Sequence, residues 1–354
     1  MLFEYFISII LAGISFLLIV FIFPKLGIVD RPDGVRKIHK GEISLGGGIG
    51  LFLSSTIFMY VLFPEYSIGA NHKFQALSVV WLISIIILTM GFLDDIKPLP
   101  ASFRLIIQIF SSWLVIILTD TYLRDFGNLF GFGNIYIGDL GIPITIFMVV
   151  GVCNAFNMLD GIDGLVGLVA FSAATAVSIL AWINGENGVL FLGSIVLLIF
   201  LVFNLGLLGR KRKIFLGDSG AMWVGFITAW FLVVLSSSGD ESIIKPVNAL
   251  WLVSIPLIDA LSTFLTRLAN KKSIFAGDRT HIHHMMLEAG LTKKKVLLIL
   301  FSISMISSST LLFFVFQKVD ESFKFFGFLT IWIVYYLIIK YPLSKQKKSD
   351  HNSK

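Results

Sequence analysis

A run of polar residues at 151–164 is the strongest chemical signal in the sequence. Within GVCNAFNMLDGIDG, Asn154, Asn157, Asp160 and Asp163 recur at every third position. Residues three apart are neighbours on one face of a helix, so two amides and two carboxylates would share that face. A capped helix end followed by a tight turn would explain one such residue, but not four in a row. We therefore interpret this segment as part of a binding or catalytic surface.

Two adjacent carboxylates form a second candidate in GFLDDIKP. Asp94 and Asp95 end an apolar run, and Arg104 opens the next one. Neighbouring like charges repel each other, so this pair is a poor device for stability. The alternative is an ordinary helix end, marked by the proline that follows.

A third candidate is the sequence IFLGDSG. Asp218 lies between Gly217 and Gly220 and follows the basic run 210–213. A hard carboxylate beside flexible backbone suits Mg²⁺, which takes oxygen ligands and usually keeps substrate phosphates in its shell. The string alone is common, so its weight depends on its neighbours.

Histidines gather in a fourth candidate, GDRTHIHH, which holds Arg279, His281, His283 and His284. A zinc site is one interpretation, since histidine is the commonest transition-metal ligand. Oxygen ligands dominate the other segments, so we favour a loop that contacts phosphate or sugar, with Arg279 as a fork of donors. A solvated loop is the third alternative.

The loop 27–48 combines basic residues with glycines. It carries Lys37 and His39 and ends in Gly46–Gly48 at the start of an apolar run. Exposed N–H groups at a helix start favour anions. Small residues also allow close helix packing in membranes, and we leave both interpretations open.

Asp259 stands apart from these segments, in the middle of the apolar run IPLIDALSTFLTR. An acid inside a membrane segment is a candidate functional residue. It could instead pair with Arg267 and hold helices or a loop in place, which we favour.

The composition excludes a soluble domain. Of 354 residues, 56% are hydrophobic and only 14% are charged, whereas soluble domains carry roughly 25% charged residues. The single cysteine, Cys153, excludes an internal disulfide and a cysteine-based metal cluster. The excess of apolar surface requires lipid.

The apolar runs predict an all-α integral membrane protein with eleven transmembrane helices. Each run approaches the about 20 residues that cross a bilayer, and none alternates as a barrel strand would. The expected spans are 2–24, 44–63, 73–93, 102–119, 141–159, 164–182, 188–207, 220–238, 247–267, 295–317 and 325–343. We expect a single polytopic domain over 1–343 and a polar, basic tail over 344–354.

The basic residues predict the orientation. Of the 28 Lys and Arg residues, 23 fall on one side of this arrangement and five on the other. The richer side is cytoplasmic by the positive-inside rule. The N-terminus is therefore expected outside, and the C-terminus in the cytoplasm.

Carboxylates from separate segments also meet on this cytoplasmic side, which indicates one site. Carboxylates that hold Mg²⁺ invert the local charge and attract phosphates, and basic residues neutralise the remaining oxygens. This is the arrangement of phosphoryl transfer, between a lipid and a soluble activated metabolite such as a nucleotide diphosphate. A secondary transporter is the alternative, although its ion sites would lie near the middle of the bilayer.

The strings NAFNMLDGIDGL, Asp94–Asp95, GDSG and HIHH, in this order, resemble the polyprenyl-phosphate N-acetylhexosamine-1-phosphate transferases. The DRTHIHH form and the eleven spans look more like the WecA branch than the peptidoglycan branch. The family commonly has proline before the glycines near the second span, where this chain has Ser44.

The resemblance implies transfer of GlcNAc-1-phosphate from UDP-GlcNAc to undecaprenyl phosphate with release of UMP, at the bacterial inner membrane; the alternative is the same chemistry with another UDP-N-acetylhexosamine. It implies Mg²⁺ as the cofactor, with Mn²⁺ as an alternative, and Asn157 and Asp218 as its ligands. The implied catalytic residues are Asp94, Asp95, Asp160 and Asp163. The implied substrate-binding residues are Lys37, His39, Arg104, Asn154, Arg279, His281, His283 and His284. The expected partners are both substrates and the bilayer, with no nucleic acid; a homodimer is left open.

Overall fold

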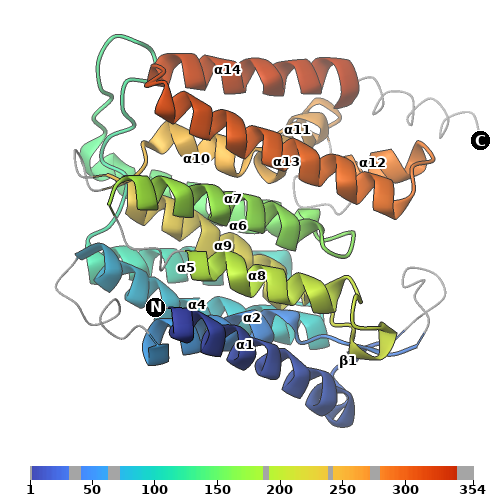
Figure 1. Ribbon diagram of the computed structural model, residues 1–354. Helices are drawn as coiled ribbons and strands as arrows, with labels where there is room; N and C mark the ends of the chain where they lie inside the picture. The colour runs from blue at the N-terminus through green and yellow to red at the C-terminus, as the bar shows by residue number, and fades with distance from the viewer. Residues whose placement is uncertain are drawn as a thin grey trace, which may run out of the picture.

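The computed structural model describes residues 2–31, 41–62, 72–185, 191–237, 242–271 and 280–340. In these residues the chain is a bundle of helices with one two-stranded sheet, in which β1 (Val29–Asp30) pairs antiparallel with β2 (Ile43–Ser44). Most of the long helices run along a common direction, and the bundle extends from the N-terminal α1 at one edge to α13 and α14 at the other (Figure 1).

In the described residues, the main helices follow the apolar runs of the sequence, and the run 247–267 forms two of them. They are α1 (Leu2–Ile22), α2 (Gly47–Thr56), α4 (His72–Ile96), α5 (Ala101–Thr119), α6 (Gly141–Leu159), α7 (Leu165–Ile183), α8 (Phe191–Asn204), α9 (Gly217–Ser236), α10 (Pro246–Leu252), α11 (Ser254–Ala269), α13 (Lys293–Phe316) and α14 (Glu321–Val334). The shorter elements are η1 (Phe23–Leu26), η3 (Gly138–Leu140), η5 (Arg210–Arg212), α12 (Ile282–Glu288) and the π-helical turns η2 (Ile57–Leu62) and η7 (Tyr335–Lys340).

Within the described ranges, seven helices are long and apolar enough to cross a membrane, or eight if the bent pair α10–α11 forms one span. The outer helices carry large apolar side chains on their exposed faces, among them Phe21, Ile106 and Leu298. Such surfaces are stable only in contact with lipid. The chain is thus an all-α, multi-pass membrane protein. The remaining runs, which the sequence predicts as further spans, form the shorter helices α2, α8 and α14 and the bent pair.

Helix α9 is the central element, and 15 of its 20 residues are buried. Glycines let its backbone touch three neighbouring helices. A Cβ at Gly91 of α4 would lie 2.4 Å from the Cα of Ser219, one at Gly225 would lie 2.9 Å from the Cα of Cys153 in α6, and one at Gly48 of α2 would lie 2.6 Å from Gly220. Helices α2, α4 and α6 are therefore held in close register around the first half of α9.

The glycines at the start of α2 serve this packing. The N–H groups of Gly47 and Gly48 donate to the carbonyls of Phe215 and Leu216, at 3.0 and 3.3 Å. These donors are used within the protein, so of the two interpretations of this segment, the structure favours packing over an anion site. The carbonyl of Ser44 likewise accepts from the N–H of Phe215.

The expected single span 247–267 is wrong in one respect, because it is broken. Helices α10 and α11 meet at an angle of 86° around Val253. Pro256 explains the break, since it has no N–H to donate to the carbonyl four residues earlier and its ring clashes with that carbonyl. The bend carries Asp259 away from the straight path that the sequence suggests.

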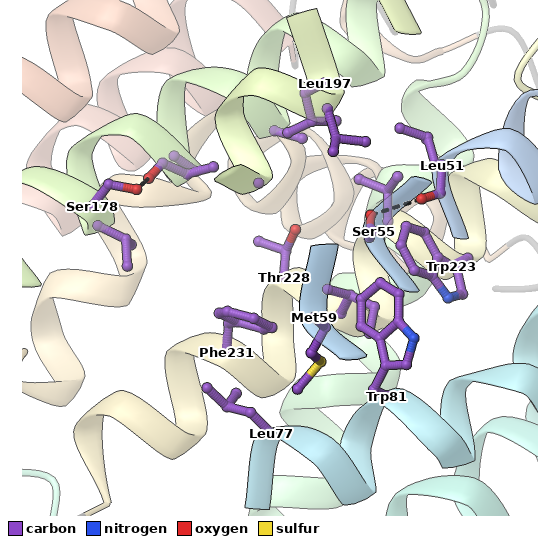
Figure 2. A pocket seen from close by; sticks show the side chains of 18 of the residues that line it. Leu51, Ser55, Met59, Leu77, Trp81, Ser178, Leu197, Trp223, Thr228 and Phe231 are labelled. Carbon is purple, nitrogen blue, oxygen red and sulfur yellow. Dashed lines mark hydrogen bonds between the residues drawn. The ribbon is translucent and has the colours of Figure 1, made fainter. Parts of the chain in front are cut away.

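An apolar cavity of about 200 Å³ lies among α2, η2, α4, α7, α8 and α9. Figure 2 shows Trp81, Trp223 and Phe231 on its wall. The hydroxyl of Ser55 on this wall donates to a carbonyl of its own helix, so it is already satisfied. The cavity can hold hydrocarbon, and the described residues of its walls include no charged group for chemistry.

Candidate active site

The predicted polar segments meet at one end of the bundle, where α4 and α6 end and α5 and α9 begin. Asp95 of α4 bonds to the first turn of α9, and Asp160, after α6, lies within the electrostatic reach of Asp95, Asp163 and Asp218. The predicted meeting of carboxylates from separate segments is found for these four residues, in that their charges influence one another. Like charges near one another are unfavourable, and a cation bound among them would relieve this repulsion.

Asp95 fixes the start of α9. Its two carboxylate oxygens accept from the N–H groups of Asp218, at 2.7 Å, and Ser219, at 3.1 Å. Gly217 has a positive φ of 74°, and a Cβ there would lie 2.7 Å from Asp95 Oδ2. The glycine is required by both its backbone conformation and this contact. Asp95 thus determines where the carboxylate of Asp218 lies.

Asp94 and Arg104 bind each other. Asp94 is buried, with 5% of its surface exposed, and its Oδ2 lies 2.7 Å from an Arg104 nitrogen. The other oxygen accepts from the N–H of Leu99 at 2.6 Å. The pair joins α4 to α5 and leaves the guanidinium of Arg104 partly exposed toward the end of the bundle.

Asn154 makes contacts inside the bundle. Its side-chain nitrogen donates to Gln108 at 2.6 Å and to the carbonyl of Val150 at 2.8 Å. Gln108 is fully buried and donates in turn to the sulfur of Met222, so it links α5, α6 and α9. The sequence analysis missed Gln108, although an amide inside an apolar run was a usable signal.

Asn157 is different, because its side-chain oxygen is available. This Oδ1 atom is buried and has no hydrogen-bond partner among the described residues. A buried amide oxygen without a partner is unfavourable, and a cation would satisfy it. Asn157 and Asp218 therefore fit the role of Mg²⁺ ligands by their donor chemistry.

Asp160 and Asp163 occupy the turn after α6. Lys213 binds Asp163 at 2.6 Å, which ties the turn to the basic run before α9. Asp160 is partly open to solvent, yet burial of its carboxyl group, followed by the charges of Asp218, Asp163 and Asp95, raises its pKa to about 8. A bound cation would reverse this effect by stabilising the ionised form.

Asn204, at the end of α8, also bonds to the turn after α6. It accepts from the N–H of Gly164 at 2.6 Å and donates to the carbonyl of Ile214 at 2.8 Å. Gly164 has a positive φ of 84°, which permits this approach. The sequence analysis missed Asn204, which stands alone at the end of an apolar run and belongs to no motif.

The histidine segment joins the site through His283. This side chain is buried, and a Cβ on Gly161 would lie 2.0 Å from its Nε2 atom. Both ring nitrogens lack a hydrogen-bond partner in the described part of the chain. Burial, and then the neighbouring His284, lowers the pKa of His283 to about 3, so the ring is neutral and can accept or donate a proton in a hydrogen bond.

His281 points elsewhere. Its Nδ1 lies 2.8 Å from a carboxylate oxygen of Asp259. The expected partner of Asp259, Arg267, is wrong: the bend after Val253 brings Asp259 to the histidine segment instead. His284 packs beside His283, with their ring centres 4.1 Å apart.

Three predicted residues, Lys37, His39 and Arg279, lie outside the described residues. Within the described residues, no three His, Cys, Asp or Glu side chains form a group that could hold a metal ion by themselves. A cation here would thus depend on the amide of Asn157 and on oxygens brought by a substrate.

The chain is similar to proteins of known family. Residues 77–236 match the model of glycosyl transferase family 4. The chain is 32% identical over 314 residues to an undecaprenyl-phosphate alpha-N-acetylglucosaminyl 1-phosphate transferase of Haemophilus influenzae, with 88% of this chain and 86% of the relative covered. It is 31% identical to the protein of that name from Salmonella typhi and 32% to that from Escherichia coli strain K12, each over 279 residues, 78% of this chain and 73% of the relative.

The region that matches the family model contains Asp94, Asp95, Asn157, Asp160 and Asp218. A transferase family also removes the reason to consider a secondary transporter. The chain therefore belongs to glycosyl transferase family 4, together with the undecaprenyl-phosphate alpha-N-acetylglucosaminyl 1-phosphate transferases that it resembles.

Proposed function

We propose that this protein transfers GlcNAc-1-phosphate from UDP-GlcNAc to undecaprenyl phosphate, releasing UMP and forming undecaprenyl-diphosphate-GlcNAc. The observation that carries the proposal is the unpartnered oxygen of Asn157 beside the gathered carboxylates at one end of a membrane bundle. The names of the relatives supply the acceptor, undecaprenyl phosphate, and the transferred group, N-acetylglucosaminyl 1-phosphate. The product would begin a glycan of the O-antigen or enterobacterial-common-antigen type.

The reaction brings two phosphorylated molecules together, so it requires positive charge. Asn157 and Asp218 would hold Mg²⁺, or Mn²⁺ in its place. When bound, the ion would neutralise phosphate oxygens and favour departure of UMP. Arg104 and Lys213, which already stand beside Asp94 and Asp163, would supply further positive charge at the rim.

Asp94 and Asp95 act as positioning groups in this proposal. A phosphomonoester has its second pKa near ~6, so the lipid phosphate is largely a dianion at neutral pH and is already nucleophilic. The contacts support this role, because Asp95 accepts two N–H groups of α9 and Asp94 is paired with Arg104. Asp160 and Asp163 would support the metal or the sugar, and His283 and His284 the diphosphate or the sugar.

The site faces the cytoplasm in this proposal, because UDP-GlcNAc is soluble and the loops that surround the site are the basic ones. We propose eleven crossings of the bacterial inner membrane over residues 1–343, with the short helices and the bent pair completing the seven long spans. The N-terminus is outside, and the tail 344–354 is cytoplasmic.

A UMP-release assay tests the proposal directly. Membranes that contain the protein should form UMP and a lipid-linked GlcNAc from UDP-GlcNAc and undecaprenyl phosphate, and a chelator should stop both. The reaction should run backward when UMP and the lipid product are supplied, since one phosphoanhydride replaces another. Release of UDP would mean that the sugar alone is transferred, and would contradict the mechanism.

Asp218→Asn supplies the matched variant. It keeps the side-chain shape and removes a charge, so it should abolish metal-dependent turnover while the protein still accumulates. Asp139→Asn is the control, since Asp139 lies in the segment 120–140 at the other end of α6 and bonds to Tyr122. Equal losses in both variants would show that the acids are not distinguished by function.

A further inference from the structure

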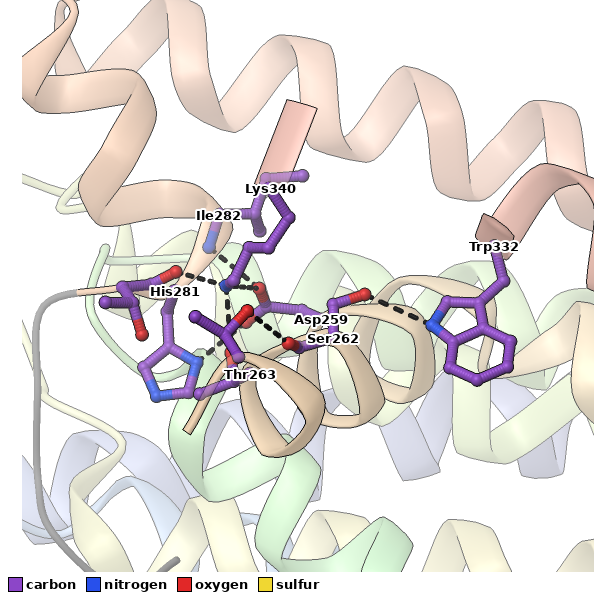
Figure 3. Close-up of polar contacts among 9 residues, drawn as sticks. Asp259, Ser262, Thr263, His281, Ile282, Trp332 and Lys340 are labelled. Atoms are coloured by element: carbon purple, nitrogen blue, oxygen red, sulfur yellow. Dashed lines mark hydrogen bonds and ion pairs between the residues drawn. The ribbon is translucent and has the colours of Figure 1, made fainter. Parts of the chain in front are cut away.

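We propose that Lys340, at the end of η7, is a positioning residue for the histidine segment: together with Asp259 it sets the orientation and tautomer of His281 and thereby seats His283 against Gly161. This inference rests on the proposed function for its effect on turnover. Figure 3 shows Lys340, Asp259 and His281 converging from three different elements.

Lys340 is a buried cation with a full set of partners. None of its surface is exposed, and its ammonium donates to Asp259 Oδ1 at 3.3 Å, to Thr263 Oγ1 at 2.9 Å and to the carbonyl of Thr280. An ammonium has three donors, so this geometry uses all of them. Burial of such a charge is unfavourable by itself, and a buried pair of this kind is better explained by specificity of arrangement than by stability.

Asp259 connects this cation to the histidines. Its Oδ1 accepts from the N–H of Ile282 at 2.9 Å as well as from Lys340, and its Oδ2 faces His281 Nδ1 at 2.8 Å. The carboxylate therefore fixes the first residue of α12 and the ring that precedes it. Lys340 holds the residue before that ring through the carbonyl of Thr280. The start of the HIHH segment is thus held by Asp259, at His281 and Ile282, and by Lys340, at Thr280.

The arrangement also selects one tautomer of His281. An ionised carboxylate that accepts from an ammonium and an amide has only acceptor capacity left, so Nδ1 of His281 must donate. In the neutral ring the lone pair then lies on Nε2, at the far side from Asp259. A ring nitrogen's role is commonly set in this way by the bond that the other nitrogen makes.

The effect passes from His281 to the site through its neighbour. The rings of His281 and His283 are nearly parallel, with an angle of 7° and centres 6.2 Å apart. His283 in turn lies over Gly161, in the turn that carries Asp160 and Asp163. Loss of the ammonium would leave the carboxylate of Asp259 buried without its cation, so the N–H of Ile282 and the ring of His281 would no longer be held in one position.

The test compares Lys340→Met with Lys324→Met. Both lysines are buried. They lie at opposite ends of the segment formed by α14 and η7, and the carbonyl of Lys324, near its start, accepts from the indole N–H of Trp251. We expect Lys340→Met to lower kcat/KM for UDP-GlcNAc by about 10- to 100-fold, as loss of an outer partner of a site residue typically does. The KM for undecaprenyl phosphate should stay within about twofold, and Lys340→Arg should recover part of the loss because it keeps the charge.

A second measurement separates this inference from the proposed function. Amide hydrogen exchange of residues 280–288 should be faster in Lys340→Met than in the unmodified protein, while exchange in α9 stays the same; this result does not require turnover. If the unmodified protein releases no UMP but exchange responds as expected, the proposed function fails and the positioning contact stands.

The inference is overturned if Lys340→Met leaves both exchange over 280–288 and the kinetics for UDP-GlcNAc unchanged. It is also overturned if the two lysine variants lose activity toward both substrates equally, since that pattern indicates a general packing role. If Lys340→Met does not accumulate, Asp259→Asn keeps the side-chain shape and carries the same two measurements.

Discussion

At the scale of single residues, Gly161 shows how small the tolerance of the site is. The Nε2 atom of His283 occupies the place where any other residue at 161 would put its Cβ, at a separation of 2.0 Å. The absence of a side chain is therefore what allows the histidine segment to touch the turn with Asp160 and Asp163. The glycine at position 161 thus leaves the space that the side chain of His283 occupies, although the two residues lie more than a hundred positions apart in the chain.

Gly161→Ala should consequently displace His283 and lower turnover by about 100-fold, the loss that follows from a misplacement of roughly 1 Å at an active site. Gly151→Ala is the matched control, because it lies on α6 and its Cβ would meet nothing within 4 Å. Steady-state rates of UMP release compare the two variants. Activity of Gly161→Ala equal to that of Gly151→Ala would show that His283 need not lie where the structure has it.

Asp160 should make the stability of the metal-free protein depend on pH. Its pKa is raised to about 8, while an unfolded chain has an aspartate pKa near ~3.9. Between these values the unfolded chain gives up a proton that the folded protein keeps, so the folded state loses stability as the pH rises from about 4 to about 8. Solvent contact of Asp160 makes this slope shallower than for a fully enclosed group.

Thermal unfolding in detergent with a chelator checks this expectation. The midpoint of the unmodified protein should fall with rising pH more steeply than that of Asp160→Asn, and Mg²⁺ should flatten the difference. Parallel pH profiles for the two proteins would count against the crowding of carboxylates around Asp160.

At the scale of elements, the start of α9 is fixed from three sides. Asp95 caps it from α4, Gly48 and Gly91 bring α2 and α4 against its first turns, and Asn204 holds the segment that leads into it. The position of Asp218 is thus a property of helix packing as much as of its own loop. Residues that touch no substrate can therefore disable the site.

Gly91→Ala tests this dependence, because its Cβ would lie 2.4 Å from the Cα of Ser219. We expect the two helices to separate, with a loss of about 1–3 kcal/mol in stability, as overpacking usually produces, and reduced metal-dependent turnover. Gly13→Ala on α1 is the control, since its Cβ would meet nothing within 4 Å. The midpoint of thermal unfolding and the rate of metal-dependent turnover should both fall in Gly91→Ala, and neither should change in Gly13→Ala.

The extent to which the sequence predicts this molecule also depends on scale. Residue spacing indicates which side chains share a helix face, and so the meeting of Asp95, Asp160, Asp163 and Asp218 could be predicted. Spacing does not indicate which face meets which helix. The pairing of Asp94 with Arg104 and the contact of Asn154 with Gln108 arise from such crossings, as does the true partner of Asp259. A single proline, Pro256, redirected a helix whose apolar pattern is continuous.

At the scale of the whole molecule, the distribution of charge predicts one topology. The basic residues are placed 23 to five between the two sides, and the site carboxylates gather at the end of the bundle that carries the richer loops. A topology reporter fused after Lys354 should therefore give a cytoplasmic signal, and a reporter inserted in the segment 120–137 should give a signal from outside the membrane. A reversed signal at Lys354 would remove one crossing and require the motif loops to be reassigned.

Because Lys340 follows Asp259 and Thr280 in the chain, its contact with them can form only late in synthesis. A ribosome makes α11 and the histidine segment well before it makes α14 and η7, so for that interval Asp259 has no ammonium beside it and the entry to α12 is held on one side only. Every segment with a chemical motif has already been synthesised at this stage, yet the contact that Lys340 makes with the histidine segment has not formed. The segment formed by α14 and η7 thus completes the positioning of the histidines after the rest of the chain has been made. A chain that ends before Glu321 would contain all of the motifs but would lack the contacts of Lys340 with Asp259 and Thr280.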